Sequence, residues 1–323
     1  MMNLEDLNSL DKQLLLKTPL SSINFNLRST PLMRAINDLK FELNEKGINF
    51  FPQIWVSSDW FSPDGVAGFA IPFYLLHPRL IKLEKTNTNR VEGHTYQNLM
   101  KLLRHETAHA IDNAFHLRKL KARQSLFGTS KTKYPKSYLP DPNNKDYVQN
   151  LDEYYAQAHP DEDWAETFAI WLNPKVDWQT KYKKWGAIKK LSYLDSVMES
   201  IKHQPPKSNR LKKVECVSKD NRTLQQYYKD RRKELRINRT PTIHKSHPDL
   251  STFIQAYKAD SKKIVTSLTG NQFVTNKFIR ELSRAKSSNQ SLNLIVKRRK
   301  CLEKELELLS LQYIKSGEYK VIM

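Results

Sequence analysis

Cysteine is scarce in this sequence. Only Cys216 and Cys301 occur among 323 residues. Two such residues cannot build the disulfide framework of a small secreted protein, and a chain of this length can bury a sizeable core without such links. Neither lies in a cluster of metal-ligand type, so both are expected to be ordinary thiols in a reducing compartment.

Export signals and long apolar runs are also lacking. Glu5, Asp6 and Asp11 lie where a signal peptide would carry a positive region followed by an apolar stretch. Nowhere do about eighteen apolar residues run together, as a membrane-spanning helix requires. We therefore predict a cytoplasmic protein with no transmembrane segment, although secretion by a route that needs no N-terminal signal would leave no trace here.

Acidic residues are scarce in one part of the chain only. The net charge of +20 divides into +3 for residues 1–200, with 26 Lys and Arg against 23 Asp and Glu, and +17 for residues 201–323, with 28 against 11. Such a basic surface suits an anionic partner, a nucleic acid or a membrane surface, which we predict for residues 207–300. No zinc-finger, KH or RRM signature accompanies the charge, and charge runs are usually solvated faces.

The change in charge also predicts the domain organisation, with a boundary near Pro205-Pro206. Residues 1–24 are expected to be a loose N-terminal segment and residues 25–205 to form the first domain. Residues 206–323 are expected to form a basic, mainly helical region with breaks at Gly270 and at residues 284–291.

The periodicity of apolar residues predicts an α+β fold for the first domain, with a small mixed sheet followed by helices. Strands are expected in residues 48–58, 65–76 and 80–85. Helices are expected over Thr30–Lys46, over His94–Arg118 and from Asp161 to the Asn173-Pro174 pair.

The second of these helices contains an HExxH motif formed by His105, Glu106 and His109. Residues four apart share one face of a helix, so both imidazoles can reach one ion while Glu106 points into the adjoining cleft. Zinc binds neutral imidazole nitrogen readily and keeps one position open for water in catalytic sites. Glu106 is then placed to take a proton from the zinc-bound water as it attacks a carbonyl. The alternative is a surface helix with two histidines, but the apolar face of this helix argues against it.

A third ligand is needed. His116 is one residue too far from His109 for the metzincin spacing, and the glycine expected between them is absent. A carboxylate from the helix that begins at Asp161 is the other common solution. The candidates there are Glu162, Asp163 and Glu166, and we favour Glu166 because small neighbours would let its face approach the first helix closely.

Three segments together resemble a bacterial family called putative zinc-binding metallo-peptidases, within the gluzincin-like zincins: IPFYLLHPRLIKLE, LLRHETAHAIDNAF and YAQAHPDEDWAETFAIWLNP. The resemblance covers residues 25–205. It implies a zincin-like fold and one zinc ion per chain, bound by His105, His109 and Glu166, with Glu106 catalytic. It supplies no substrate.

Gluzincins often carry a carboxylate four residues after the glutamate ligand, where it orients a zinc histidine. With Glu166 as ligand, that position is Ile170, so Asp112 or Asp163 would have to take this role. Related zincins often stabilise the oxyanion with a Tyr or His shortly before the glutamate ligand. His159 and Tyr155 fit, and Tyr154 is a further candidate, although packing roles are also open to them.

Two functions are compatible with the sequence. The first is a zinc metallopeptidase that hydrolyses a protein or peptide substrate by Glu106-assisted attack of zinc-bound water. The alternative is a non-catalytic, zinc-containing binding module whose basic C-terminal region recruits nucleic acid, anionic membrane or a protein partner. The presence of Glu106 favours the peptidase, because a structural site needs no base beside its ligands.

Overall fold

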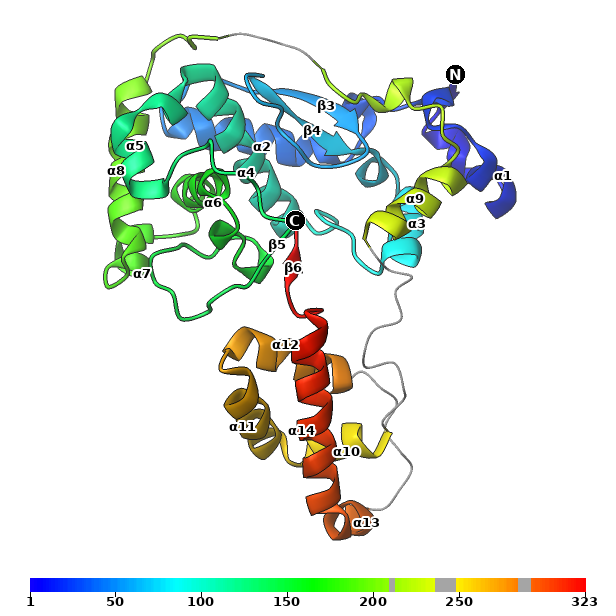
Figure 1. Cartoon of the computed structure of the whole chain (residues 1–323). Helices are drawn as coiled ribbons and strands as arrows, with labels where there is room; N and C mark the ends of the chain where they lie inside the picture. The colour runs from blue at the N-terminus through cyan, green and yellow to red at the C-terminus, as the bar shows by residue number, and fades with distance from the viewer. Residues whose placement is uncertain (209–212, 236–247, 284–291) are drawn as a thin grey trace. The chain divides into compact units, whose positions relative to one another are not determined.

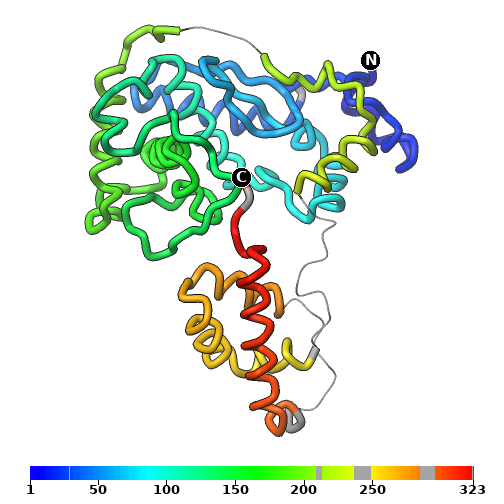
Figure 2. The backbone as a smooth tube through the Cα atoms, in the orientation of Figure 1, coloured from blue at the N-terminus to red at the C-terminus, as the bar shows by residue number. Residues whose placement is uncertain are grey.

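The structure is a computed structural model that describes residues 1–208, 213–235, 248–283 and 292–323 (Figure 1). The chain splits into two compact units. Unit 1 comprises Met1–Lys133 and Lys145–Asn238, and unit 2 comprises Tyr134–Asn144 and Arg239–Met323. The backbone of each can be followed by colour in Figure 2. Each unit has its own cluster of buried apolar side chains.

Unit 1 extends beyond residue 205, where the change in charge led us to expect a boundary. The following segment adds buried side chains to the core of unit 1, among them Leu224, Tyr227 and Tyr228 of α9 (Leu224–Glu234). The hydroxyl of Tyr227 donates to the backbone oxygen of Ser58 at 3.0 Å. Net charge describes the solvent face of α9 and not its apolar face, so the turn to basic composition does not mark the edge of this core.

Residues 1–24, which we expected to be loose, also pack into unit 1. Strand β1 (Met2–Asn3) pairs in parallel with β2 (Ile23–Asn24), and Asp11 caps α1 (Lys12–Lys17) by accepting from two backbone N–H groups. Leu7, Leu15 and Leu20 are buried. Leu7 and Leu20 lie in 3-10 segments and Leu15 lies in the six-residue helix α1, and segments this short produce no periodic pattern that the sequence alone would reveal.

The sheet that supports the site is a parallel pair of strands, simpler than the mixed sheet we expected. β3 (Gln53–Ser57) pairs with β4 (Gly68–Pro72), and Gln53 faces Gly68. Both lie within predicted strands. A Cβ atom at Gly68 would lie 2.3 Å from the backbone oxygen of Gln53, so only glycine allows this approach.

The prediction of a third strand at residues 80–85 is wrong, because this segment belongs to α3 (Pro78–Thr88). His77 caps the helix by accepting from the N–H of Arg79, and Pro78 occupies the first turn. Apolar and polar residues alternate over this short segment, as they do in a strand. The cap at His77 and the proline in the first turn instead favour a helix.

Two central helices carry the residues of interest, α4 (Tyr96–Phe115) and α6 (Pro160–Leu172), and they pack against each other. Both follow the predictions closely. Thr95 caps α4, and His116, with φ of 58°, ends it in a left-handed conformation. Around them lie α2 (Leu32–Glu45), α5 (Lys121–Phe127), α7 (Trp178–Tyr182) and α8 (Ala187–Ile201).

Unit 2 is mainly helical, as expected for the C-terminal region. Its helices are α10 (Pro248–Ala256), α11 (Lys258–Thr269), α12 (Gln272–Ser283), α13 (Leu292–Lys297) and α14 (Arg299–Ser316). The predicted break at Gly270 is confirmed by its left-handed φ of 62°, whereas the predicted break at 284–291 lies outside the described residues. β5 (Ser137–Tyr138) pairs antiparallel with β6 (Val321–Ile322).

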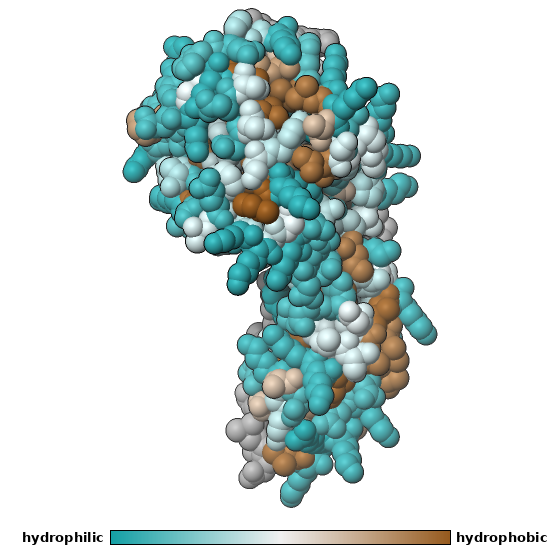
Figure 3. All heavy atoms as spheres, turned by 90° about the vertical axis from the view of Figure 1, so that its left-hand side faces the viewer, coloured by the Kyte–Doolittle hydropathy of each residue, from teal (hydrophilic) through white to brown (hydrophobic). Residues whose placement is uncertain are grey.

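Within the described residues, no helix is both long and apolar enough to cross a membrane. The face of the molecule drawn in Figure 3 is mostly hydrophilic, with apolar patches between polar side chains.

Candidate metal centre

Helix α4 presents His105 and His109 on one face, as their spacing predicted, and buries Glu106 beside them. The Nε2 atoms of the two imidazoles lie 3.2 Å apart. Two ring nitrogens aimed at one point are the first requirement of a shared metal site.

Helix α6 supplies a carboxylate to the same point, and that carboxylate is Glu162. Its Oε2 lies 3.0 Å from Nε2 of His105 and 3.5 Å from Nε2 of His109. One ligand atom from each of the three residues lies within 4.8 Å of the other two. His105, His109 and Glu162 therefore form a buried cluster that could hold a metal ion, and in the described part of the chain it is the only such cluster.

The electrostatics of the cluster favour a positive charge. Burial alone would lower the pKa of His105, but hydrogen bonds with Glu162 and Glu166 raise it well above its usual value. Burial would raise the pKa of Glu162, but the two histidines lower it well below the usual range. The carboxylates thus stabilise a cation here, whether a protonated imidazole or a metal ion.

Glu166, the ligand we predicted, lies on the other side of His105. Its Oε1 is 2.8 Å from Nδ1 of that imidazole and accepts from Nδ2 of Asn150 at 2.9 Å. Its Oε2 accepts from the N–H of Leu151 at 2.7 Å. Lys101 of α4 fixes the same loop by donating to the backbone oxygen of Asn150. A proton on Nδ1 then points to Glu166, which leaves the lone pair of Nε2 for a metal.

The structure thus brings Glu162 to the cluster in place of Glu166. The sequence carries a signal for Glu162: with Glu162 as ligand, the carboxylate four residues later is Glu166. With Glu162 in that place, the departure noted at Ile170 disappears. Nothing in the sequence pointed to Asn150, since it lies in a loop.

Glu106 has the surroundings expected of a general base. It is 6% exposed, and its Oε2 has no hydrogen-bond partner in the protein. Burial raises the pKa of this carboxyl against the opposing charges of His105 and His109. A buried, unpaired carboxylate oxygen is costly unless a water or substrate proton can reach it.

Of the two residues predicted to stabilise an oxyanion, Tyr155 lies beside the cluster. Its ring centroid is 5.7 Å from that of His105. Glu153 and Tyr154, just before it, have left-handed backbone conformations with φ of 61° and 57°. Strained backbone of this kind is often found at functional sites.

His159, the other predicted residue, has a capping contact. Its Nδ1 accepts from the N–H of Asp161 at 3.1 Å, which caps α6, and its Nε2 donates to the backbone oxygen of Thr132 at 2.8 Å. Both ring nitrogens are engaged with the backbone, so His159 fastens a loop to the start of α6.

The acids considered as acceptors for a zinc histidine have other partners. Asp163 pairs with Lys190 at 2.6 Å. Asp112 accepts from Arg118 at 3.2 Å and from Arg123 at 3.0 Å. The contact with His105 that we expected of one of them is made by Glu166.

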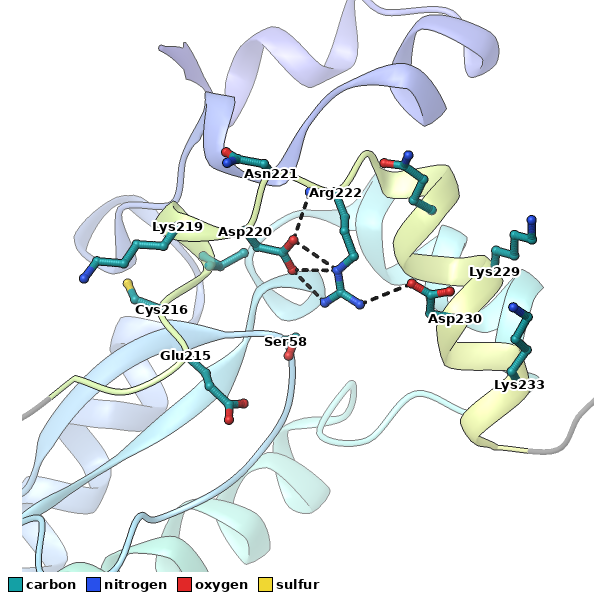
Figure 4. A pocket seen from close by; sticks show the side chains of 12 residues that line it. Ser58, Glu215, Cys216, Lys219, Asp220, Asn221, Arg222, Lys229, Asp230 and Lys233 are labelled. Carbon is teal, nitrogen blue, oxygen red and sulfur yellow. Dashed lines mark hydrogen bonds and ion pairs between the residues drawn. The ribbon is translucent and has the colours of Figure 1, made fainter.

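Unit 1 also contains a cavity of about 810 Å³, which lies away from the metal cluster in the sense that different residues line it (Figure 4). It is lined by the segment from Glu215 to Arg222 and by one face of α9. Its arginine, Arg222, pairs with Asp220 at 2.7 Å and with Asp230 at 3.5 Å. None of the lining residues belongs to the metal cluster.

Comparison with known families gives one result. Residues 82–229 match the model of a family described as "Putative zinc-binding metallo-peptidase". The match contains α4 and α6 whole and confirms the family inferred from the three segments. No curated protein and no solved structure matches the chain.

Proposed function

We propose that this chain, whose residues 82–229 match the model of the putative zinc-binding metallo-peptidase family, is a zinc-dependent peptidase with a zincin-like catalytic domain in unit 1. The observation that carries the proposal is the convergence of His105, His109 and Glu162 beside the buried, unpaired carboxylate oxygen of Glu106. A structural zinc site needs no such base, and it usually has four protein ligands.

The donor set fits zinc. Two imidazole nitrogens and one carboxylate oxygen are the three protein ligands typical of one class of catalytic zinc site, in which the fourth position serves water or substrate. We assign these ligands to His105, His109 and Glu162, one zinc per chain. Glu166 is assigned the role of positioning His105 through Nδ1, at 2.8 Å.

In this proposal a bound zinc ion supplies Lewis acidity, polarising the scissile carbonyl and making water more acidic. Glu106 accepts the proton of the attacking water and returns it to the leaving amine. Burial suits this task, because it raises the pKa of the Glu106 carboxyl and so makes its carboxylate a stronger base.

Tyr155 is assigned to the oxyanion. Its ring lies against His105, beside the proposed ligands, and its hydroxyl is the group that would donate to the carbonyl oxygen as negative charge develops there. His159 is not assigned this role, because both of its ring nitrogens bind backbone groups.

The test is cleavage of a mixed peptide library by the zinc-loaded chain, with products identified by mass spectrometry. The matched control is Glu106→Gln, which keeps the size of the side chain and all three proposed ligands. We expect wild-type cleavage at a defined set of bonds, loss of this cleavage with a chelator, and at least a 100-fold lower rate in Glu106→Gln. Zinc-loaded wild type that cleaves nothing, or a Glu106→Gln variant that cleaves the same bonds at the same rate, would contradict the proposal.

A further inference from the structure

Arg123 is a fully buried arginine close to the metal cluster. It lies on α5, is 0% exposed, and has its guanidinium carbon 4.8 Å from the centre of the Trp164 ring. Its Nη1 donates to the hydroxyl of Ser130 at 3.1 Å. Burying a guanidinium costs free energy unless carboxylates neutralise its charge. The carboxylates that bind Arg123 therefore show which elements of the fold it holds together.

One nitrogen of Arg123 joins the two helices that carry the cluster. Nη2 lies 3.0 Å from Oδ2 of Asp112 on α4 and 3.1 Å from Oδ1 of Asp161 on α6. Asp112 lies one turn after His109, and Asp161 immediately precedes Glu162. The bridge therefore connects the helix of the histidines to the helix of the carboxylate within one turn of a residue of the cluster on each side.

The bridge is well suited to fixing a distance. The guanidinium is planar and rigid, and here it is bound on several sides by Asp112, Asp161, Ser130 and the face of Trp164. Arg118 supplies a second cation to Asp112 at 3.2 Å, so two arginines face the two aspartates. No other side chain in the described residues binds both Asp112 and Asp161 in this way.

We propose that Arg123 is a positioning residue of the metal centre. By clamping α4 to α6 it holds His105, His109 and Glu162 at ligand distance before metal arrives. The proposal rests on the proposed function, because it assumes that these three residues bind zinc. It does not make Arg123 catalytic, since its contacts are with Asp112, Asp161, Ser130 and Trp164 and not with the ligands themselves.

The chain offers a matched control in Arg104. This arginine is also buried, at 5% exposure, and binds Glu42 through two hydrogen bonds of 2.7 and 2.6 Å. It lies on α4 directly before His105, but it joins α4 to α2, which carries no residue of the cluster. If closeness in sequence to a ligand were what mattered, Arg104 would be the more sensitive position.

The experiment compares zinc affinity in wild type, Arg123→Met, Arg123→Lys and Arg104→Met, by competition with a chromophoric chelator at pH 7. Thermal unfolding of the metal-free proteins reports the structural cost of each change. We expect both methionine variants to lose thermal stability. Only Arg123→Met should also bind zinc about 10–100-fold more weakly, the loss typical of groups that orient metal ligands.

Arg123→Lys keeps a buried cation and is the variant to rely on if Arg123→Met does not fold. A lysine cannot reproduce the planar bridge, so we expect an intermediate loss of affinity. Wild-type affinity in Arg123→Lys and in any folded Arg123→Met, or an equal loss in Arg104→Met, would overturn the proposal while leaving the zinc site intact. A wild-type chain that binds no zinc would instead overturn the proposed function, and this inference with it.

Discussion

Replacing Glu162 and Glu166 by alanine, one at a time, separates a metal ligand from the residue that positions one. The two carboxylates lie one turn apart on α6 and are both buried, at 5% and 0% exposure. Only Glu162 places an oxygen beside Nε2 of both histidines, at 3.0 and 3.5 Å. Glu166 contacts His105 at Nδ1. We therefore expect Glu162→Ala to weaken zinc binding more than Glu166→Ala.

The size of the difference follows from the two roles. Four-ligand structural zinc sites contribute about 10–16 kcal/mol, so one ligand accounts for about 2.5–4 kcal/mol, or roughly a 10²–10³-fold change in affinity. Loss of a group that only orients a zinc histidine costs about 10–100-fold. We expect losses of these two sizes for Glu162→Ala and Glu166→Ala respectively.

The assay is competition for zinc with a chromophoric chelator at pH 7, on variants whose circular dichroism matches that of the wild type. Glu199→Ala, which removes a carboxylate with 68% of its side chain exposed, is the control and should leave the affinity unchanged. An equal loss in the two variants, or a larger loss in Glu166→Ala, would refute the assignment of Glu162 as the ligand.

Three further predictions concern catalysis, pH and packing. Tyr155→Phe should lower kcat by roughly 10²–10³ with little change in zinc affinity, as steady-state kinetics and chelator competition will show, and an unchanged kcat would count against its role. Burial raises the pKa of Glu84 from 4.5 to about 7, against the opposing charge of Arg231. The protonated carboxyl of Glu84 therefore stabilises the folded state. This stabilisation is fully present below pH 4.5 and is lost as the pH rises through about 7. Urea unfolding should show that the free energy of unfolding of Glu84→Gln, relative to that of wild type, rises by about 3 kcal/mol between pH 4.5 and pH 8. A difference between the two proteins that does not change with pH would contradict the raised pKa. Gly68→Ala should lower the free energy of unfolding by about 1–3 kcal/mol or more, because the new Cβ would lie 2.3 Å from the backbone oxygen of Gln53, and an unchanged melting temperature would refute this.

The helix with the motif could be predicted nearly to its ends, His94–Arg118 against the observed Tyr96–Phe115. Its wide apolar face and four-residue histidine spacing are local properties that the backbone period converts directly into geometry. The same holds for α6, whose end at the Asn173-Pro174 pair follows from the restriction that proline places on the residue before it.

The choice between Glu162 and Glu166 could not be made from helical period alone, because residues four apart share a face. In the structure Asn150 and Leu151 donate to the carboxylate of Glu166, while an oxygen of Glu162 faces both histidines. These contacts come from a loop with no periodic pattern. The role of Arg123 has no periodic pattern either, because Asp112 and Asp161, the two acids that it bridges, lie on two other helices.

His159 shows how one residue type can serve two purposes. A histidine shortly before the glutamate suggested oxyanion stabilisation, but its position directly before Pro160 is also that of a helix cap, and the structure shows the cap.

The anionic partner expected for residues 207–300 stays a prediction. Within the described residues of unit 2, Arg298 pairs with Asp249 and Arg299 with Asp260 and Glu303, so part of the positive charge is neutralised internally.

The most direct test of the central claim is anomalous diffraction at the zinc edge from crystals of the chain purified without added metal. The account predicts one zinc peak per chain, about 2.0–2.2 Å from Nε2 of His105, Nε2 of His109 and a carboxylate oxygen of Glu162, with Glu166 on Nδ1 of His105. A zinc ion bound by Glu166 would contradict the ligand assignment. The absence of any zinc peak at the cluster, also after soaking with zinc, would contradict the metallopeptidase itself.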